Sequence, residues 1–147
     1  MASSARELAT IQLLGGARTL GARVVTSEDL RTSVRRGLPF RTLGVVLDGL
    51  RVPREQAARV LGLPLRTLAR RRQAGTLAPD ESDRLARLAR IAGVARDVFG
   101  EQDIAARWLR RPNRALGGEA PIEMLDTDLG ARRVEQILGR IEYGVPS

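Results

Sequence analysis

Apolar residues recur along this chain at intervals of three and four positions, with polar and charged residues between them. That spacing predicts amphipathic helices, because it places apolar side chains on one face of a helix with 3.6 residues per turn. The segment 41–50 shows the pattern most plainly, with an apolar face made of Leu43, Val46, Leu47 and Leu50. We therefore expect an all-α fold.

Capping residues, glycines and prolines predict where the helices begin and end. The expected helices cover residues 27–36, 41–50, 53–61, 64–74, 80–99, 102–111, 121–125 and 127–143. Glycines interrupt residues 1–26, which predicts a flexible arm with one or two helical turns at most. The expected organisation is an arm and short helix over 1–37, a helix-turn-helix domain with a long connecting helix over 38–99, and a C-terminal domain over 100–147.

The same periodicity predicts which side chains face the core. Beyond the 41–50 helix, the residues expected to point inward are Leu65, Leu68, Ala69, Ile104, Ala105, Trp108, Leu109, Leu129, Val134, Ile137, Leu138 and Ile141. The long helix carries a further stripe at heptad-like spacing, made of Leu85, Leu88, Ala92, Ala95 and Phe99. This stripe fits either an ordinary core-facing surface or a seam between two copies of the chain.

Residues 53–75 have the pattern of a helix-turn-helix. Ala58 is small where the two helices would cross, and Gly62 lies four positions later, in the expected tight turn. Leu61, Leu63 and Leu68 would hold the pair together. This spacing is common by chance in helical proteins, so the charge of the segment decides how it is interpreted.

The charge is strongly asymmetric. The net charge is +8 and all 25 basic residues are Arg; residues 1–92 contain 17 Arg and 8 acidic residues, whereas residues 93–147 contain 8 and 9. Residues 51–75 hold seven Arg and one acid, which favours contact with DNA phosphates over simple solubility. The predicted DNA-binding residues are Arg54, Arg66, Thr67, Arg70, Arg71 and Arg72. One helix-turn-helix reads a half-site, so operator binding implies a homodimer.

The composition excludes much catalytic chemistry. The chain has no His, Cys or Lys, so it lacks an imidazole base, a thiolate and an amine nucleophile. We therefore expect no enzyme activity, no metal and no cofactor. No apolar run is long enough to span a bilayer and residues 1–16 do not resemble a signal peptide, so the expected location is the cytoplasm.

The segment 108–145 concentrates helix ends, turns and the single Trp and single Tyr, Trp108 and Tyr143. Without titratable chemistry, such a block is more typical of a binding surface than of an active site. Arg140 and Tyr143 lie on a final helical turn, and both residue types are enriched in binding hot spots. Asn113 is more often a turn former than a ligand, and Trp108 more often a core anchor.

These residues together resemble the Xre/MbcA/ParS family of antitoxins, the partners of RES-domain toxins. The resemblance covers roughly residues 38–147, and its C-terminal part is the more specific. The motifs that carry it are Arg66-Thr67-Leu68, Glu81-Ser82-Asp83-Arg84-Leu85, Val98-Phe99-Gly100, Trp108-Leu109, Pro112-Asn113, Ala115-Leu116-Gly117-Gly118, Pro121, Leu125-Asp126-Thr127 and Arg140-Ile141-Glu142-Tyr143-Gly144-Val145.

The resemblance implies an Xre-like helix-turn-helix bundle followed by a small helical toxin-binding domain. It implies an antitoxin that blocks an NAD-depleting RES-domain toxin and represses its own operon. Carried onto this chain, the toxin-binding residues would be Asn113, Arg114, Leu116, Arg140, Ile141, Tyr143, Gly144 and Val145. The alternative is a solitary helix-turn-helix regulator whose C-terminal block serves dimerisation or ligand sensing.

Overall fold

The computed structural model describes residues 2–21 and 23–144, and this part of the chain is helical, without a β-strand. This confirms the all-α prediction. Its helices are α1 (Ala2–Leu13), α2 (Gly16–Leu20), α3 (Ser27–Arg36), α4 (Arg41–Gly49), α5 (Ala57–Leu61), α6 (Leu65–Ala74), α7 (Pro79–Phe99), α8 (Gln102–Arg110) and α9 (Asp128–Glu142), with 3₁₀ helices η1 (Arg54–Gln56), η2 (Arg114–Leu116) and η3 (Pro121–Asp126).

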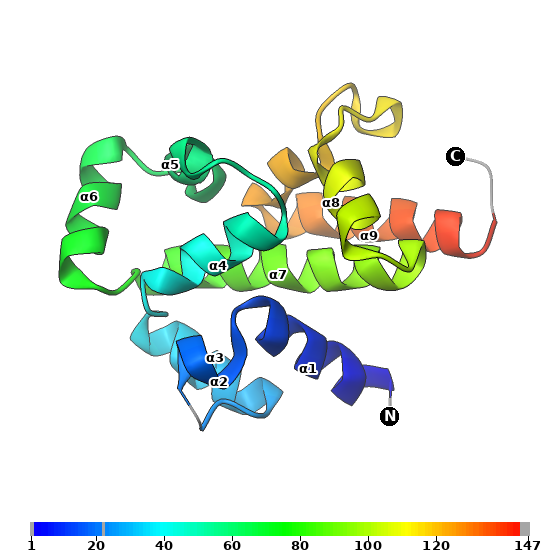
Figure 1. Ribbon diagram of the computed structural model, residues 1–147. Coiled ribbons are helices and arrows are strands. Elements are labelled where there is room, and N and C mark those ends of the chain that lie inside the picture. Colours follow the sequence, from blue (N-terminus) through cyan, green and yellow to red (C-terminus); the bar gives the residue numbers. More distant parts are fainter. Residues whose placement is uncertain (1, 22, 145–147) are drawn as a thin grey trace.

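The long helix α7 runs through the middle of the molecule, and the other elements pack around it (Figure 1). Helices α1 and α3 contact it on one side, and α8 and α9 contact it on another. Its stripe of Leu85, Leu88, Ala92 and Ala95 is at most 5% exposed within the single chain. The core-facing interpretation is therefore confirmed for these positions, because they are already covered without a second copy.

The prediction of a flexible arm over residues 1–26 is wrong. Helix α1 packs along α7, and its Ile11 and the following Leu14 are buried at 5% and 0% exposure. Gly93 of α7 faces this helix, and a Cβ placed there would make an ordinary van der Waals contact with Leu13 Cδ1, at 3.6 Å. The Gly15-Gly16 pair, with φ of 105° and 61°, turns the chain between α1 and α2 rather than loosening it.

Helix α3 begins with a reciprocal cap. The Thr26 hydroxyl accepts a hydrogen bond from Asp29 N at 3.1 Å, while the Asp29 carboxylate accepts from Thr26 N at 3.0 Å. The capping residue is therefore Thr26, and Ser27 lies in the first turn of the helix. Gly37 ends the helix as expected, at φ 97°.

Several side chains predicted to face inward are exposed. Ala105, Leu109, Val134, Ile137 and Leu138 are buried as expected. The predictions for four large apolar residues and one small one are wrong: Leu65 is 74% exposed, Leu129 77%, Ile104 40% and Ile141 38%, and Ala69 is also exposed. These residues lie on outer helices, each of which packs against its neighbours through a narrow face. Their apolar stripe is wider than the face that a neighbour covers, so its outermost residues remain exposed.

Candidate functional site

The helix-turn-helix predicted over residues 53–75 is present as η1, α5 and α6. Ala58 and Leu61 of α5 and Leu68 of α6 are buried, at 8%, 1% and 7% exposure. Between the helices Gly62 has φ 66°, a left-handed conformation that suits glycine. The Leu63 amide donates to the Ala58 carbonyl at 2.8 Å and tightens the turn. The predicted turn at Gly62 is confirmed, and Ala58, Leu61 and Leu68 are buried as the motif requires.

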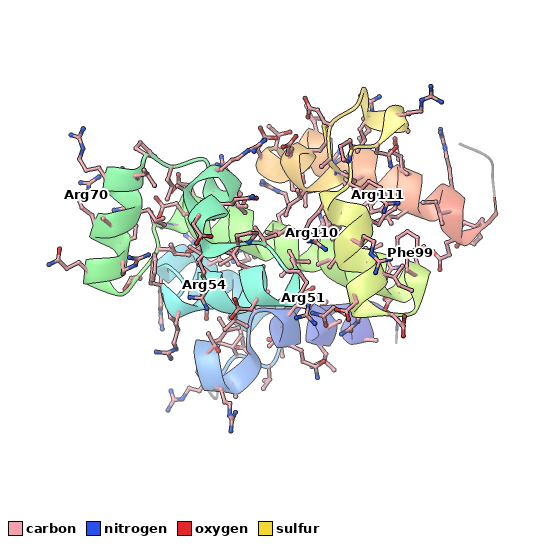
Figure 2. The ribbon with its side chains drawn as sticks, turned by 45° about the horizontal axis from the view of Figure 1, so that its top comes forward. Arg51, Arg54, Arg70, Phe99, Arg110 and Arg111 are labelled. Carbon is pink, nitrogen blue, oxygen red and sulfur yellow. The ribbon has the colours of Figure 1, made fainter. Side chains whose placement is uncertain are left out.

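The second helix of this motif, α6, presents an arginine-rich outer face. Arg66 and Arg70 are exposed, and Figure 2 shows Arg70 extending from α6 away from the body of the molecule. The Arg70 guanidinium lies 3.4 Å from the Thr67 hydroxyl. The guanidinium carbon of Arg72 lies over the Phe40 ring, 5.7 Å from the ring centroid, in a cation–π contact. Arg72 is nevertheless exposed at the surface.

Arg71 is directed back into the fold. Its Nε donates to both carboxylate oxygens of Glu81, at 2.9 and 3.2 Å, and Glu81 is only 3% exposed. This hydrogen bond raises the pKa of the Arg71 guanidinium above its ordinary value. Glu81 also accepts from the Ala78 amide at 2.8 Å, at the start of α7. Of the predicted DNA-binding arginines, Arg71 is thus the one engaged in holding α6 to α7.

Arg54 is paired as well, but at the surface. Its guanidinium lies 2.9 Å from a carboxylate oxygen of Asp48, and the two side chains are 65% and 64% exposed. The hydrogen bond from Arg54 lowers the pKa of Asp48. Local sequence patterns do not reveal Asp48 or Glu81 as a partner, because each pair joins residues of different helices.

Polar contacts join the helix-turn-helix to the C-terminal helices. Arg51, at φ 57°, pairs with Asp103 of α8 at 3.2 Å, and its carbonyl accepts from Arg110 at 3.3 Å. Figure 2 shows Arg51 and Arg110 approaching one another between these elements. Arg59 of α5 pairs with Glu123 of η3. The two halves of the chain are therefore packed as one unit around α7.

The predicted toxin-binding turn is built by Asn113. Its side-chain oxygen accepts from the Ala115 amide at 2.9 Å, and its own amide donates to the Glu119 carbonyl at 2.9 Å. Leu116 is 4% exposed and anchors the turn, whereas Arg114 is exposed. Asn113 and Leu116 thus shape the turn, and Arg114 lies on its surface.

Four of the other predicted toxin-binding residues lie at the end of α9. Arg140, Ile141, Tyr143 and Gly144 are all exposed, Tyr143 at 81%, and Gly144 ends the helix with φ 69°. Val145 lies outside the described residues. The Asn113 turn contacts an earlier part of α9, where Arg133 donates a hydrogen bond to the Ala115 carbonyl at 3.0 Å. Arg140 is seven residues further, roughly 10 Å along the helix.

Within residues 2–21 and 23–144, no group of acidic side chains is arranged to hold a metal ion. No helix in the same part of the chain has the length and hydropathy needed to cross a bilayer.

The fold and these surfaces define a class of two-part all-α protein, in which a helix-turn-helix unit and a helical C-terminal unit share one central helix. Residues 29–90 match the family model described as the antitoxin Xre-like helix-turn-helix domain. Residues 94–144 match the model described as the antitoxin Xre/MbcA/ParS C-terminal toxin-binding domain. The boundary between the two models falls inside α7.

The chain is also similar to curated antitoxins. It is 36% identical over 132 residues to an antitoxin Xre from Photorhabdus laumondii, covering 88% of this chain and 89% of that protein. It is 32% identical over 130 residues to an antitoxin Xre from Yersinia enterocolitica, covering 87% and 88%. A protein from a Sphingobium species named Prs ADP-ribosylating antitoxin is 34% identical over 77 residues, or 46% and 48% of the two chains.

The chain therefore belongs to the antitoxin Xre family, which is a family of antitoxins and not of enzymes. This confirms the family resemblance found in the sequence. It also confirms the architecture of an Xre-like helix-turn-helix followed by a C-terminal domain of the toxin-binding family.

Proposed function

We propose that this chain neutralises a partner toxin through its C-terminal helices and represses its own operon through its helix-turn-helix. The observation that carries the proposal is the separation of two exposed surfaces. The arginine face of α6 lies near one end of α7, and the last turn of α9 lies near the other (Figure 1). Helix α7 has 21 residues and is roughly 30 Å long, so toxin and DNA would bind without competing for space.

The toxin in this proposal is a RES-domain protein that depletes NAD⁺. Its support is the family to which the chain belongs and the chemistry in the name of the Sphingobium relative, since ADP-ribosylation consumes NAD⁺. The last turn of α9 would fill the cleft that admits the dinucleotide. Arg140 supplies a cation for the acidic or polar groups of that cleft, and Tyr143 supplies rigid contact area at low entropic cost.

The proposed blocking of the toxin by the last turn of α9 is tested by co-expressing the toxin encoded by the adjacent gene with this chain truncated after Leu138. The truncation removes an exposed end of α9 and leaves the buried Val134, Ile137 and Leu138 in place. Full-length chain is expected to restore growth and the truncated chain to fail, at equal expression and equal helical content. Full relief of toxicity by the truncated chain would contradict the proposal.

The DNA-binding half of the proposal rests on the exposed arginines of α6. In this proposal Arg66, Arg70 and Arg72 of α6, with Thr67, would contact phosphates on both sides of a major groove. Arg54 of η1 would add a further phosphate contact. Two copies of the chain would then read the two halves of a palindromic operator. A titration of the upstream DNA at several salt concentrations tests this: affinity that does not change with salt would contradict it.

A further inference from the structure

Helix α6 exposes one large apolar side chain, that of Leu65. It is the first residue of the helix and is 74% exposed, whereas Leu68, one turn later, is 7% exposed and supplies the contact with the core. Ala69, four positions after Leu65, is also exposed, so the two form a short apolar strip along the helix. Covering an exposed leucine with an apolar partner removes its surface from water and would stabilise a complex.

The surroundings of this strip indicate what covers it. Arg66 and Arg70 are exposed beside it, so the strip lies within the basic face rather than next to an apolar neighbour. A second protein surface would have to desolvate these guanidinium groups, which is costly unless each is paired. DNA offers phosphates for the arginines and one apolar group in its major groove, the 5-methyl group of thymine.

The position of Leu65 in the motif fits that partner. In a helix-turn-helix, the N-terminal residues of the second helix reach the base edges in the major groove. Arginine contacts to phosphates fix orientation but carry no sequence information. An apolar side chain at the start of α6 is therefore placed to provide the readout that Arg66 and Arg70, as phosphate contacts, do not.

We propose that Leu65, supported by Ala69, reads a thymine methyl group in each half-site of the operator. The inference rests on the proposed DNA binding and makes it more specific. Burial of one methyl group against Leu65 corresponds to about a four-fold gain in affinity, or about fifteen-fold for the two half-sites of a dimer.

The test compares two versions of the DNA immediately upstream of the gene, amplified with either dTTP or dUTP. Uracil keeps the hydrogen-bonding edge of thymine and lacks the methyl group. Wild-type chain is expected to bind the thymine duplex several-fold more tightly than the uracil duplex. Leu65→Ala is expected to bind both duplexes equally, with the affinity that the wild type shows for uracil DNA. Leu129→Ala is the matched control, since Leu129 is 77% exposed on the first turn of α9.

The outcomes separate the two proposals. Loss of the thymine preference in Leu65→Ala alone, with Leu129→Ala like the wild type, supports the inference. If wild type and Leu65→Ala show the same ratio of affinity for the thymine duplex to affinity for the uracil duplex, the inference is overturned. Salt-dependent binding in the same titrations would still support the repressor proposal. Absence of salt-dependent binding by the wild type on either duplex overturns both.

Discussion

The guanidinium of Arg71 and the carboxylate of Glu81 form a largely buried ion pair that fastens α6 to the first turn of α7. Arg71 Nε lies 2.9 Å from Glu81 Oε1, and the two side chains are 28% and 3% exposed. The same carboxylate accepts from the Ala78 amide at 2.8 Å. One acidic residue therefore sets both the orientation of the DNA-facing helix and the start of the central helix.

Replacing Glu81 should destabilise the fold. Glu81→Ala leaves the Ala78 amide and the Arg71 guanidinium without their acceptor, and loss of one partner of a buried pair costs about 2–4 kcal/mol. Chemical unfolding of the purified chain measures this. Asp83→Ala, two positions away and exposed on the same helix, is the control and should change the free energy of unfolding much less. Equal stability of Glu81→Ala and wild type would show that the pair does not hold α6.

Arg70 and Arg71 should respond differently to the same substitution. Arg70→Ala is expected to weaken DNA binding and to reduce the slope of log affinity against log salt by about one, with unchanged thermal stability. Arg71→Ala is expected to lower the thermal midpoint, because it removes the partner of Glu81. Binding isotherms at several salt concentrations, together with melting curves, separate the two effects. Identical behaviour of both variants in both measurements would contradict this division of roles.

The Arg71 pair also shows where the sequence stops being informative. Periodicity, glycines and prolines predicted most helices between residues 27 and 144, because these signals are local. The basic run predicts Arg71 as a DNA contact, because the local sequence says nothing about a carboxylate ten residues away. The prediction for residues 1–26 is wrong for a related reason: α1 packs against α7, which begins more than 60 residues further along the chain.

Two glycines of α9 should respond to alanine with opposite signs. A Cβ on Gly130 would collide with the Met124 carbonyl oxygen of η3, which is backbone and has little freedom to move. A Cβ on Gly139, in the same helix, would meet nothing within 4 Å. Gly139→Ala is therefore expected to stabilise the chain by about 0.5–1 kcal/mol through helix propensity, and Gly130→Ala to destabilise it. Chemical unfolding measures the change in free energy of unfolding for both variants. If Gly130→Ala stabilised the chain as Gly139→Ala does, the contact with η3 would be contradicted.

The cap of α3 should make stability depend on pH in the acid range. Hydrogen bonds from the Val25 and Thr26 amides lower the pKa of Asp29 below its ordinary value of 3.8. A carboxylate with a lowered pKa stabilises the folded state above pH 3.8, and that contribution is lost as the pH falls through the folded-state pKa. Wild type should therefore melt at a higher temperature than Asp29→Ala at pH 6. The part of this difference that comes from the carboxylate charge should shrink as the pH falls below 3.8 and through the folded-state pKa.

If the final turn of α9 blocks the toxin, Tyr143 should carry much of the affinity. The side chain is 81% exposed, so Tyr143→Ala should leave the melting temperature and DNA binding unchanged. Truncation of an aromatic hot spot typically costs about 2 kcal/mol or more, which corresponds to roughly a 30-fold loss of toxin affinity. Leu129→Ala, at the opposite end of the same helix, is the control. Calorimetric titration of the purified toxin into each variant measures the change, and equal affinities for Tyr143→Ala and wild type would remove this residue from the interface.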